Sequence, residues 1–129
     1  MSNRCFLMLV ASLAALGCGA MAGIGAAVNT AQLRPGDSVA VFGCGGVGLS
    51  VIQGAKLCNA LPIIAVDVRA EKESDARRFG ATHFINASST DPVAAIRDIT
   101  AGGADFTFEV TGNVEQAELC YKATRRAGT

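Results

Sequence analysis

The chain has 129 residues, half of them apolar, with 15 glycines, three prolines and no tryptophan. This length suits one domain with one core, and the composition is that of a packed globular protein rather than a disordered one. Eleven basic residues balance eleven acidic ones, so no broad positive field exists to hold a nucleic acid or an anionic membrane. Five widely spaced cysteines without a CxxC pair disfavour a disulfide framework and a self-contained zinc site.

The first 18 residues have two interpretations. Arg4, an apolar stretch over residues 6–16 and small residues before Cys18 are typical of an export signal, and residues 15–18 resemble a bacterial lipoprotein cleavage site. The other interpretation is a buried helix over residues 7–16 of a cytoplasmic protein. We favour the helix, because the residues after Cys18 continue into a cofactor-binding fold without a linker.

Small residues dominate positions 20–29 and predict a helix that packs closely against other backbone and ends near Thr30. Pro35 and Gly36 then indicate a turn. Beyond this turn strands alternate with helices, without the short turns of antiparallel hairpins. The expected strands cover residues 38–42, 61–66, 83–85 and 104–110, and the expected helices cover residues 46–57, 71–79, 92–99 and 114–126. This alternation predicts the α/β class, as a Rossmann-type doubly wound parallel sheet.

A glycine-rich loop, Gly43-Cys44-Gly45-Gly46-Val47-Gly48, follows the first strand and opens the first helix. In this context GxGxxG is the pattern of a dinucleotide phosphate loop. Gly43 permits the tight turn, Gly45 lets the backbone approach a pyrophosphate, and Gly48 lets the helix lie close to the sheet. The amide groups at the helix N-terminus then face the anion.

Asp67 lies at the end of the second strand, 19 residues after Gly48. An acid at this place accepts the hydroxyls of a ribose and repels a 2′-phosphate, so we expect NAD rather than NADP. The alternative is that Asp67 only caps the loop. Lys72 has two interpretations: it reaches the adenosine ribose or phosphate, or it is a solvated lysine without a role in binding.

Six segments agree in order and spacing with one family. They are residues 16–19, 25–30, 39–48, 63–67, 79–82 and 108–112, and together they resemble the zinc-dependent medium-chain alcohol dehydrogenases. The resemblance implies that Val68, Val110 and Thr111 also contact the cofactor. It further implies that the chain is a fragment, with a helical lead-in from an inter-domain seam over residues 1–34 and a partial NAD-binding domain over residues 35–129, from which the C-terminal strands are missing.

The resemblance also implies a role for Cys18. This residue stands where the family places one ligand of its catalytic zinc, in a loop at the seam between the two lobes. The other two ligands belong to a lobe that this sequence does not contain, and catalytic zinc needs three protein ligands. A buried thiol without metal is the alternative for Cys18.

These observations predict part of an oxidoreductase that uses NAD and zinc to oxidise the CH–OH group of a primary or secondary alcohol. A thiol-formaldehyde adduct and an aryl alcohol are the narrower possibilities. We expect small alcohols or aldehydes as partners, homo-oligomers among full-length relatives, and no activity from this chain alone. The alternative is a non-catalytic NAD-binding module or a decayed fragment.

Overall fold

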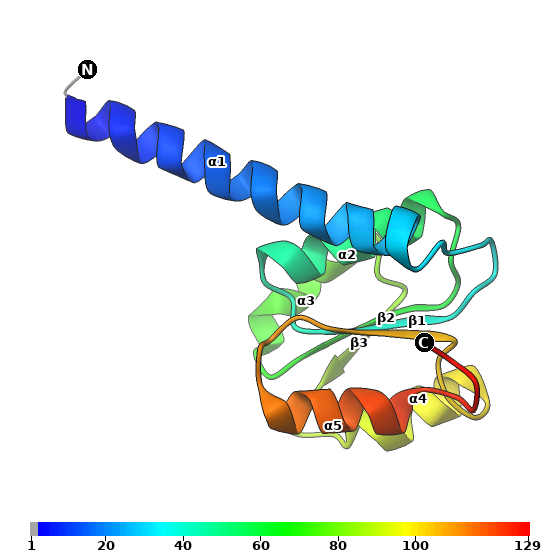
Figure 1. Ribbon diagram of the computed structural model, residues 1–129. Coiled ribbons are helices and arrows are strands. Elements are labelled where there is room, and N and C mark those ends of the chain that lie inside the picture. The colour runs from blue at the N-terminus through cyan, green and yellow to red at the C-terminus, as the bar shows by residue number, and fades with distance from the viewer. Residues whose placement is uncertain (1–2) are drawn as a thin grey trace.

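The computed structural model describes residues 3–129, without the side chains of residues 11–16, and shows a parallel sheet between two layers of helices (Figure 1). The helices are α1 (Asn3–Gly25), the π-helix η1 (Ala26–Thr30), α2 (Gly46–Leu57), the 3-10 helix η2 (Ala70–Lys72), α3 (Glu73–Phe79), α4 (Pro92–Thr100) and α5 (Val114–Ala123). The strands are β1 (Val39–Phe42), β2 (Ile63–Asp67), β3 (His83–Asn86) and β4 (Phe106–Glu109). The predicted α/β class and all four predicted strands are confirmed.

The strands lie in the order β3-β2-β1-β4, and every neighbouring pair is parallel. Phe42 at the end of β1 pairs with Val66 of β2 and with Glu109 of β4, so the strands end at a common edge. The chain moves outward from β1 to β3 and then returns to the other side of β1. This reversal creates a switch point between β1 and β4, and ligands of open α/β sheets bind outside the carboxyl ends of the strands at such a point.

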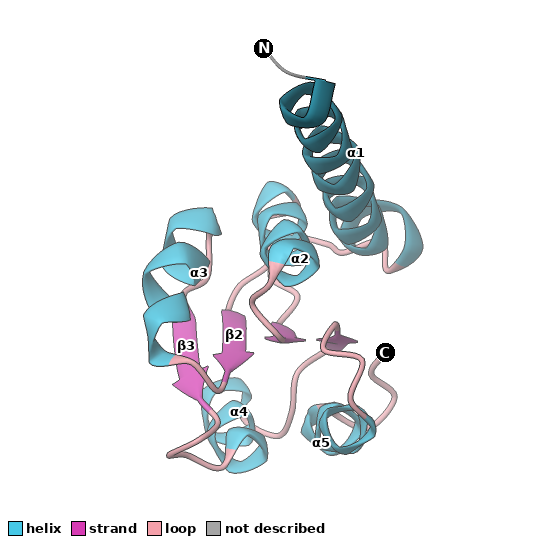
Figure 2. Cartoon of the chain, turned by 90° about the vertical axis from the view of Figure 1, so that its left-hand side faces the viewer, coloured by secondary structure: helices cyan, strands magenta, loops and turns pink. Residues whose placement is uncertain are grey.

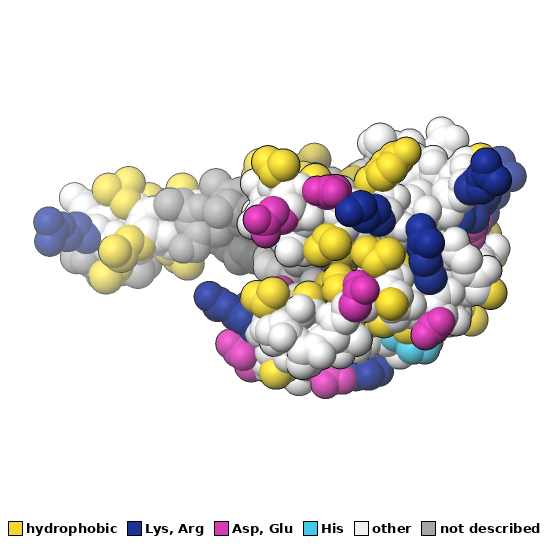
Figure 3. All heavy atoms as spheres, turned by 90° about the horizontal axis from the view of Figure 1, so that it is seen from below, with side chains coloured by type: hydrophobic (Ala, Val, Ile, Leu, Met, Phe, Trp, Pro, Cys, Tyr) yellow, Lys and Arg dark blue, Asp and Glu magenta, His cyan; other side chains and the backbone are white. Residues whose placement is uncertain are grey.

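The two central strands, β1 and β2, are buried on both faces, as their continuous apolar runs predict, while β3 and β4 are mostly half-buried. Successive side chains of a strand point to opposite faces. Val39 and Val41 therefore join the cluster beneath α2 and α3, while Ala40 and Phe42 join the cluster that α4 and α5 cover. Figure 2 shows α2 and α3, with α1 beyond them, on one side of the sheet, and α4 and α5 on the other. On the face of α4 and α5, acidic and basic side chains are interspersed (Figure 3).

The end of α1 packs against α2 through glycines. A Cβ atom at Gly23 would lie 2.7 Å from the carbonyl oxygen of Val47, and one at Gly54 would lie 2.9 Å from the Cβ atom of Ala27. No larger side chain fits without moving a helix. The close packing expected of residues 20–29 is confirmed, and it places α1 beside the start of α2.

The N-terminal half of α1 differs from the prediction. The expected buried helix over residues 7–16 is part of one continuous helix that projects beyond the rest of the molecule (Figure 1). Phe6 is 55% exposed and Met8 is 72% exposed. Apolar composition predicts burial only where a partner surface exists, and no other described element covers these residues. None of the helices within residues 3–129 is long and apolar enough to cross a bilayer.

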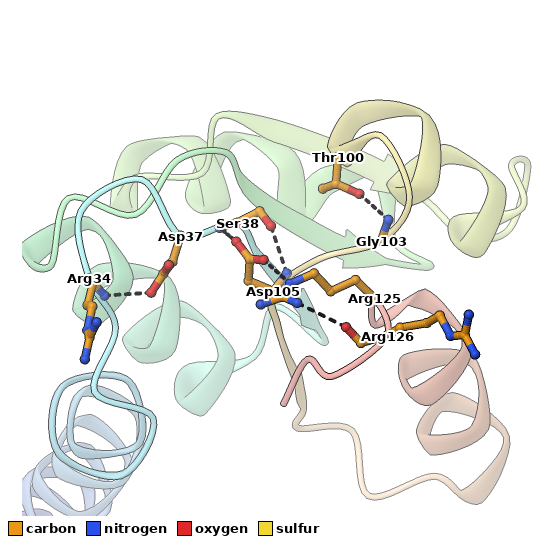
Figure 4. Close-up of polar contacts among 8 residues, drawn as sticks. All are labelled: Arg34, Asp37, Ser38, Thr100, Gly103, Asp105, Arg125 and Arg126. Atoms are coloured by element: carbon orange, nitrogen blue, oxygen red, sulfur yellow. Dashed lines mark hydrogen bonds and ion pairs between the residues drawn. The ribbon is translucent and has the colours of Figure 1, made fainter.

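The amino edge of the sheet, opposite the glycine loop, is joined by reciprocal hydrogen bonds (Figure 4). The Ser38 N–H donates to Asp105 Oδ2 at 3.0 Å, and the Asp105 N–H donates to Ser38 Oγ at 2.8 Å. Arg125 pairs with the same carboxylate. The Ser38 amide, followed by the Arg125 guanidinium, holds the pKa of Asp105 below its usual value. These contacts fix β1, β4 and the segment after α5 together, and they occupy the polar groups of this edge with structural bonds.

Candidate dinucleotide-binding site

The glycine loop connects β1 to α2 at the carboxyl edge of the sheet. Gly43 has a φ of +108°, which L side chains rarely adopt, and Gly45 is the N-cap of α2. The first bond of the helix runs from the Leu49 N–H to the Gly45 carbonyl at 2.9 Å. The amides of Gly46 to Gly48 precede it, and such amides point out of a helix toward a ligand or solvent. The loop therefore presents donors and a partial positive charge at the end of β1.

The glycines of the loop serve two different needs. A Cβ atom at Gly48 would overlap the carbonyl oxygen of Gly43, and one at Gly43 would lie 2.9 Å from Thr111 Cγ2. These two glycines let the loop close on itself and on the segment after β4. Gly45 and Gly46 have no heavy atom within 4 Å of a built Cβ position and are exposed. The open side of the loop is thus bare backbone, which a phosphate group can approach closely.

Asp67, the last residue of β2, lies beside the loop. Its Oδ2 accepts the Cys44 N–H at 2.9 Å, and its Oδ1 accepts the Arg69 N–H at 2.9 Å. Asp67 therefore does cap the loop, as one of the two interpretations expects. A carboxylate has about four lone-pair positions, so two acceptor positions remain for ribose hydroxyls. The capping bonds orient the carboxylate and leave the ribose role open to it.

A cavity of about 230 Å³ lies at this edge, between the glycine loop and the segment after β4. Of the predicted contact residues, Gly43, Asp67, Val68 and Thr111 line it. Four further lining residues were not predicted from the sequence, namely Val66, Ala87, Asn113 and Gln116. Their positions at the end of β2 and after β3 and β4 are the signal that could have found them, because parallel strands end at one edge. Larger surface hollows, such as one of about 540 Å³ between α2 and α3, lie away from the carboxyl ends of the strands.

The other predicted residues surround this cavity without lining it. Val110 packs against the core beneath α2, and its N–H donates to the Phe42 carbonyl at 3.1 Å. Val47 is 39% exposed on the open side of the loop. Lys72 ends η2, and its positive charge partly offsets the burial and the Asp67 charge that together raise the pKa of Cys44. The contact of Lys72 with the dinucleotide stays a prediction.

Cys44 lies inside the loop but points into the core. Its side chain is fully buried, and its thiol lies 3.9 Å from the carbonyl oxygen of Val66. Burial, with a further contribution from the negative charge of Asp67, raises the pKa of Cys44 from 9.0 to about 12. The thiol is therefore protonated near neutral pH and fills the space beneath the loop as a small apolar group.

We expect Cys44 to resist alkylation. At pH 8 a thiol with this pKa is ionised about a thousandfold less than one at 9.0, and the thiolate is the reactive form. Cys58 is only half-buried and provides the internal comparison. Iodoacetamide followed by peptide mass spectrometry should label Cys58 much faster than Cys44, and Cys44→Ser should leave the rapid labelling unchanged. Equal labelling of the two residues would show that the thiol is not buried.

Cys18 is placed differently from the prediction. It lies within α1 and is exposed, whereas a loop was expected. Nothing between residues 7 and 25 ends a helix, since the segment contains no proline and its glycines cost only about 1 kcal/mol each. A Cβ atom built on the neighbouring Gly19 would lie 3.8 Å from Val47 Cγ2. Cys18 is therefore next to a residue that faces the glycine loop.

Comparison with known proteins agrees with this geometry. Residues 46–129 match the model of the zinc-binding dehydrogenases. The chain belongs to this family. It is 49% identical over 116 residues to the S-(hydroxymethyl)glutathione dehydrogenase of Saccharomyces cerevisiae, covering 83% of this chain and 30% of the yeast protein. An Escherichia coli O1:K1 / APEC protein of the same name is 49% identical over 113 residues, covering 86% of this chain and 31% of that protein.

Solved structures of family members have the same fold. The benzyl alcohol dehydrogenase of Acinetobacter calcoaceticus superposes with a TM-score of 0.85 at 43% identity, covering 88% of this chain and 31% of that one. The 2R,3R-butanediol dehydrogenase of Bacillus subtilis superposes with a TM-score of 0.78 at 39% identity, covering 85% of this chain and 32% of that one. The chain thus spans less than a third of the length of these dehydrogenases.

Membership of the zinc-binding dehydrogenases implies NAD and zinc as cofactors. The open backbone at Gly45 and Gly46 and the oriented carboxylate of Asp67 fit a dinucleotide. The part of the chain that the structure describes does not by itself fit zinc, because no three His, Cys, Asp or Glu side chains lie together there. Cys18 offers a single thiol, where catalytic zinc needs three protein ligands.

Proposed function

We propose that the carboxyl edge of this sheet binds NAD, as the dinucleotide-binding part of a zinc-dependent alcohol dehydrogenase. The observation that carries the proposal is the glycine loop, whose bare outer backbone opens α2 while Asp67 holds the Cys44 amide beside it. When bound, NAD would supply the acceptor for the hydride that leaves the CH–OH carbon of the substrate. The residues of this chain bind and orient the dinucleotide.

The residues of this edge would hold different parts of the dinucleotide. The first amides of α2, at Gly46 and the residues after it, would donate to the pyrophosphate beside the bare backbone of Gly45. Asp67, at the end of β2, would accept the hydroxyls of the adenosine ribose. Val68 and Thr111 line the same cavity as Asp67, and with Lys72 and Val110 they would complete the contacts around it.

The substrate class comes from the relatives. Their names describe dehydrogenases of S-(hydroxymethyl)glutathione, benzyl alcohol and butanediol. We therefore propose a primary or secondary alcohol for the whole protein, with a thiol-formaldehyde adduct or an aryl alcohol as the narrower choices. Cys18 is proposed as one zinc ligand, completed by residues outside this chain. Oxidation of an alcohol by the purified 129-residue chain, supplied with NAD and zinc, would contradict this division of roles.

We also place the protein in the cytoplasm. The alternative, export as a lipoprotein, requires cleavage before Cys18. Such cleavage would cut α1 and detach its N-terminal part from the segment that packs on α2. An intact mass that includes the first 17 residues would agree with this placement, and a lipidated Cys18 would contradict it.

Titration with NADH tests the proposed function. The reduced nicotinamide fluoresces, so binding by the 129-residue chain can be followed without a substrate. We expect saturable 1:1 binding with a dissociation constant below about 1 mM, a binding free energy of about −4 kcal/mol or stronger. NAD and AMP should compete with NADH, because they share the adenosine position. Absence of saturable binding by the folded chain would refute the proposal.

A further inference from the structure

Arg69 lies on the turn that follows β2, two residues after Asp67. Its N–H donates to Asp67 Oδ1 at 2.9 Å, which holds the backbone of Arg69 directly beside the carboxylate. Arg69 is also the N-cap of η2, where its carbonyl oxygen accepts the Lys72 N–H at 3.2 Å. The base of the Arg69 side chain is therefore fixed close to Asp67 by a bond on each side of the residue.

The guanidinium group of Arg69 has no partner of its own within the described residues. Arg69 is exposed, and none of the hydrogen bonds or ion pairs found there involves its side chain. The next two arginines differ, because Arg77 pairs with Glu73 and Arg78 with Asp75 along α3. Arg69 thus places a cation with five N–H donors beside Asp67, where a ligand can reach it.

An arginine and an acid at this place favour different dinucleotides. The acid accepts the ribose hydroxyls of NAD, whereas a nearby arginine accommodates the 2′-phosphate of NADP. The planar guanidinium group suits a phosphate well, because two of its N–H groups can donate to two phosphate oxygens at once. This chain carries both groups on one turn. The repulsion of a 2′-phosphate by Asp67 is therefore opposed by an attraction from Arg69.

The other charged residues of the turn are placed differently. Glu71 and Lys72 lie within η2 and carry opposite charges. Lys72 is predicted to contact the adenosine ribose or phosphate, which NAD and NADP share, so it would not distinguish the two dinucleotides. Arg69 is the cation of this turn whose backbone is bonded to the Asp67 carboxylate. It is therefore the residue best placed to read the 2′ position.

We infer that Arg69 is a second specificity-determining residue, which binds the 2′-phosphate of NADP and lowers the preference for NAD that Asp67 creates. The inference rests on the proposed function, because Asp67 must face the adenosine ribose for Arg69 to lie near its 2′ position. Asp67 alone predicts NAD rather than NADP. With Arg69 beside it, the chain prefers NAD and still binds NADP.

Removal of the Arg69 charge tests the inference. We expect Arg69→Gln to weaken NADPH binding about tenfold, as loss of a hydrogen bond between charged groups predicts, and to leave NADH binding within about twofold of the original chain. Arg126→Gln removes the same charge from an exposed side chain at the amino edge. This matched control should change neither affinity. Equal weakening of NADH and NADPH by Arg69→Gln, or no weakening of NADPH, would overturn the inference.

Two smaller nucleotides provide a readout on the unaltered chain. AMP and adenosine 2′,5′-bisphosphate differ only in the 2′-phosphate. In the ¹⁵N-labelled chain the bisphosphate should shift the Nε–H signal of Arg69, whereas AMP should leave it in place. Binding of the bisphosphate without this shift would refute the inference, and so would NADH binding by a chain that binds no NADPH. Failure of the proposed function has a different signature, since the unaltered chain would then bind neither NADH nor AMP.

Discussion

Gly48→Ala should abolish NADH binding and lower the free energy of unfolding by about 3 kcal/mol or more. The added methyl group would overlap the Gly43 carbonyl oxygen, which is backbone and cannot rotate away. Relief requires the loop to move off the start of α2, and overpacking of this kind costs roughly 1–3 kcal/mol even where side chains can adjust. Urea unfolding and NADH titration measure the two effects.

Gly45→Ala should separate binding from stability. A Cβ atom at Gly45 meets nothing within 4 Å, and the Gly45 φ of −78° suits any residue. The free energy of unfolding should therefore change by at most about 1 kcal/mol, because alanine is a weaker N-cap than glycine. NADH affinity should nevertheless fall about tenfold or more, because the methyl group occupies the approach of the pyrophosphate. Gly25→Ala, which also meets nothing, should leave the affinity unchanged. Undiminished binding by Gly45→Ala would show that the phosphate groups lie elsewhere.

Asp67→Asn should reduce the preference for NADH over NADPH by about tenfold or more. The carboxylate accepts ribose hydroxyls and repels a 2′-phosphate, and hydrogen bonds to charged groups contribute about 1.5–3 kcal/mol each. The amide keeps the size of the side chain and one acceptor oxygen, so one of the two bonds from the Cys44 and Arg69 amides is retained. NADH binding should therefore weaken strongly, and NADPH binding should weaken little or improve.

A nearby charge change controls for general electrostatics. Glu71→Gln removes a negative charge four residues from Asp67, in η2, from a side chain that does not line the cavity. It should leave the ratio of the two dissociation constants within about twofold, since exposed charges interact weakly across solvent. If Asp67→Asn and Glu71→Gln change the ratio equally, Asp67 has no direct contact with the ribose.

The parts of the fold that local residues determine were predicted well. Helix α2 covers the predicted residues 46–57, because Gly45 precedes it and Asn59 takes the left-handed conformation after it, with a φ of 58°. Gly80 ends α3 with a φ of 128°, and Asp91 caps α4 through the Val93 N–H, as expected. Each of these signals acts within about four residues, which is the range that a sequence pattern reports.

The predictions that differ from the structure concern segments whose conformation depends on contacts with distant parts of the chain. Helix α5 ends at Ala123 rather than residue 126, because Thr124 turns extended and pairs with Ala104 in the sheet layer. The length and exposure of α1, and with them the helical setting of Cys18, depend on which surfaces are present to cover that segment. The hydrogen bonds from the Thr111 and Gly112 N–H groups to the Glu109 carboxylate were also not predicted, because a glutamate in this role is not one of the standard turn patterns.

The position of the dinucleotide is the central claim, and amide chemical shifts of the ¹⁵N-labelled chain test it most directly. Addition of NAD should shift the amides of the glycine loop, Asp67 and Thr111 at the carboxyl edge, and leave those of Ser38, Gly103 and Asp105 at the amino edge unchanged. Shifts confined to the amino edge, or no saturable shifts in the folded chain, would contradict the account.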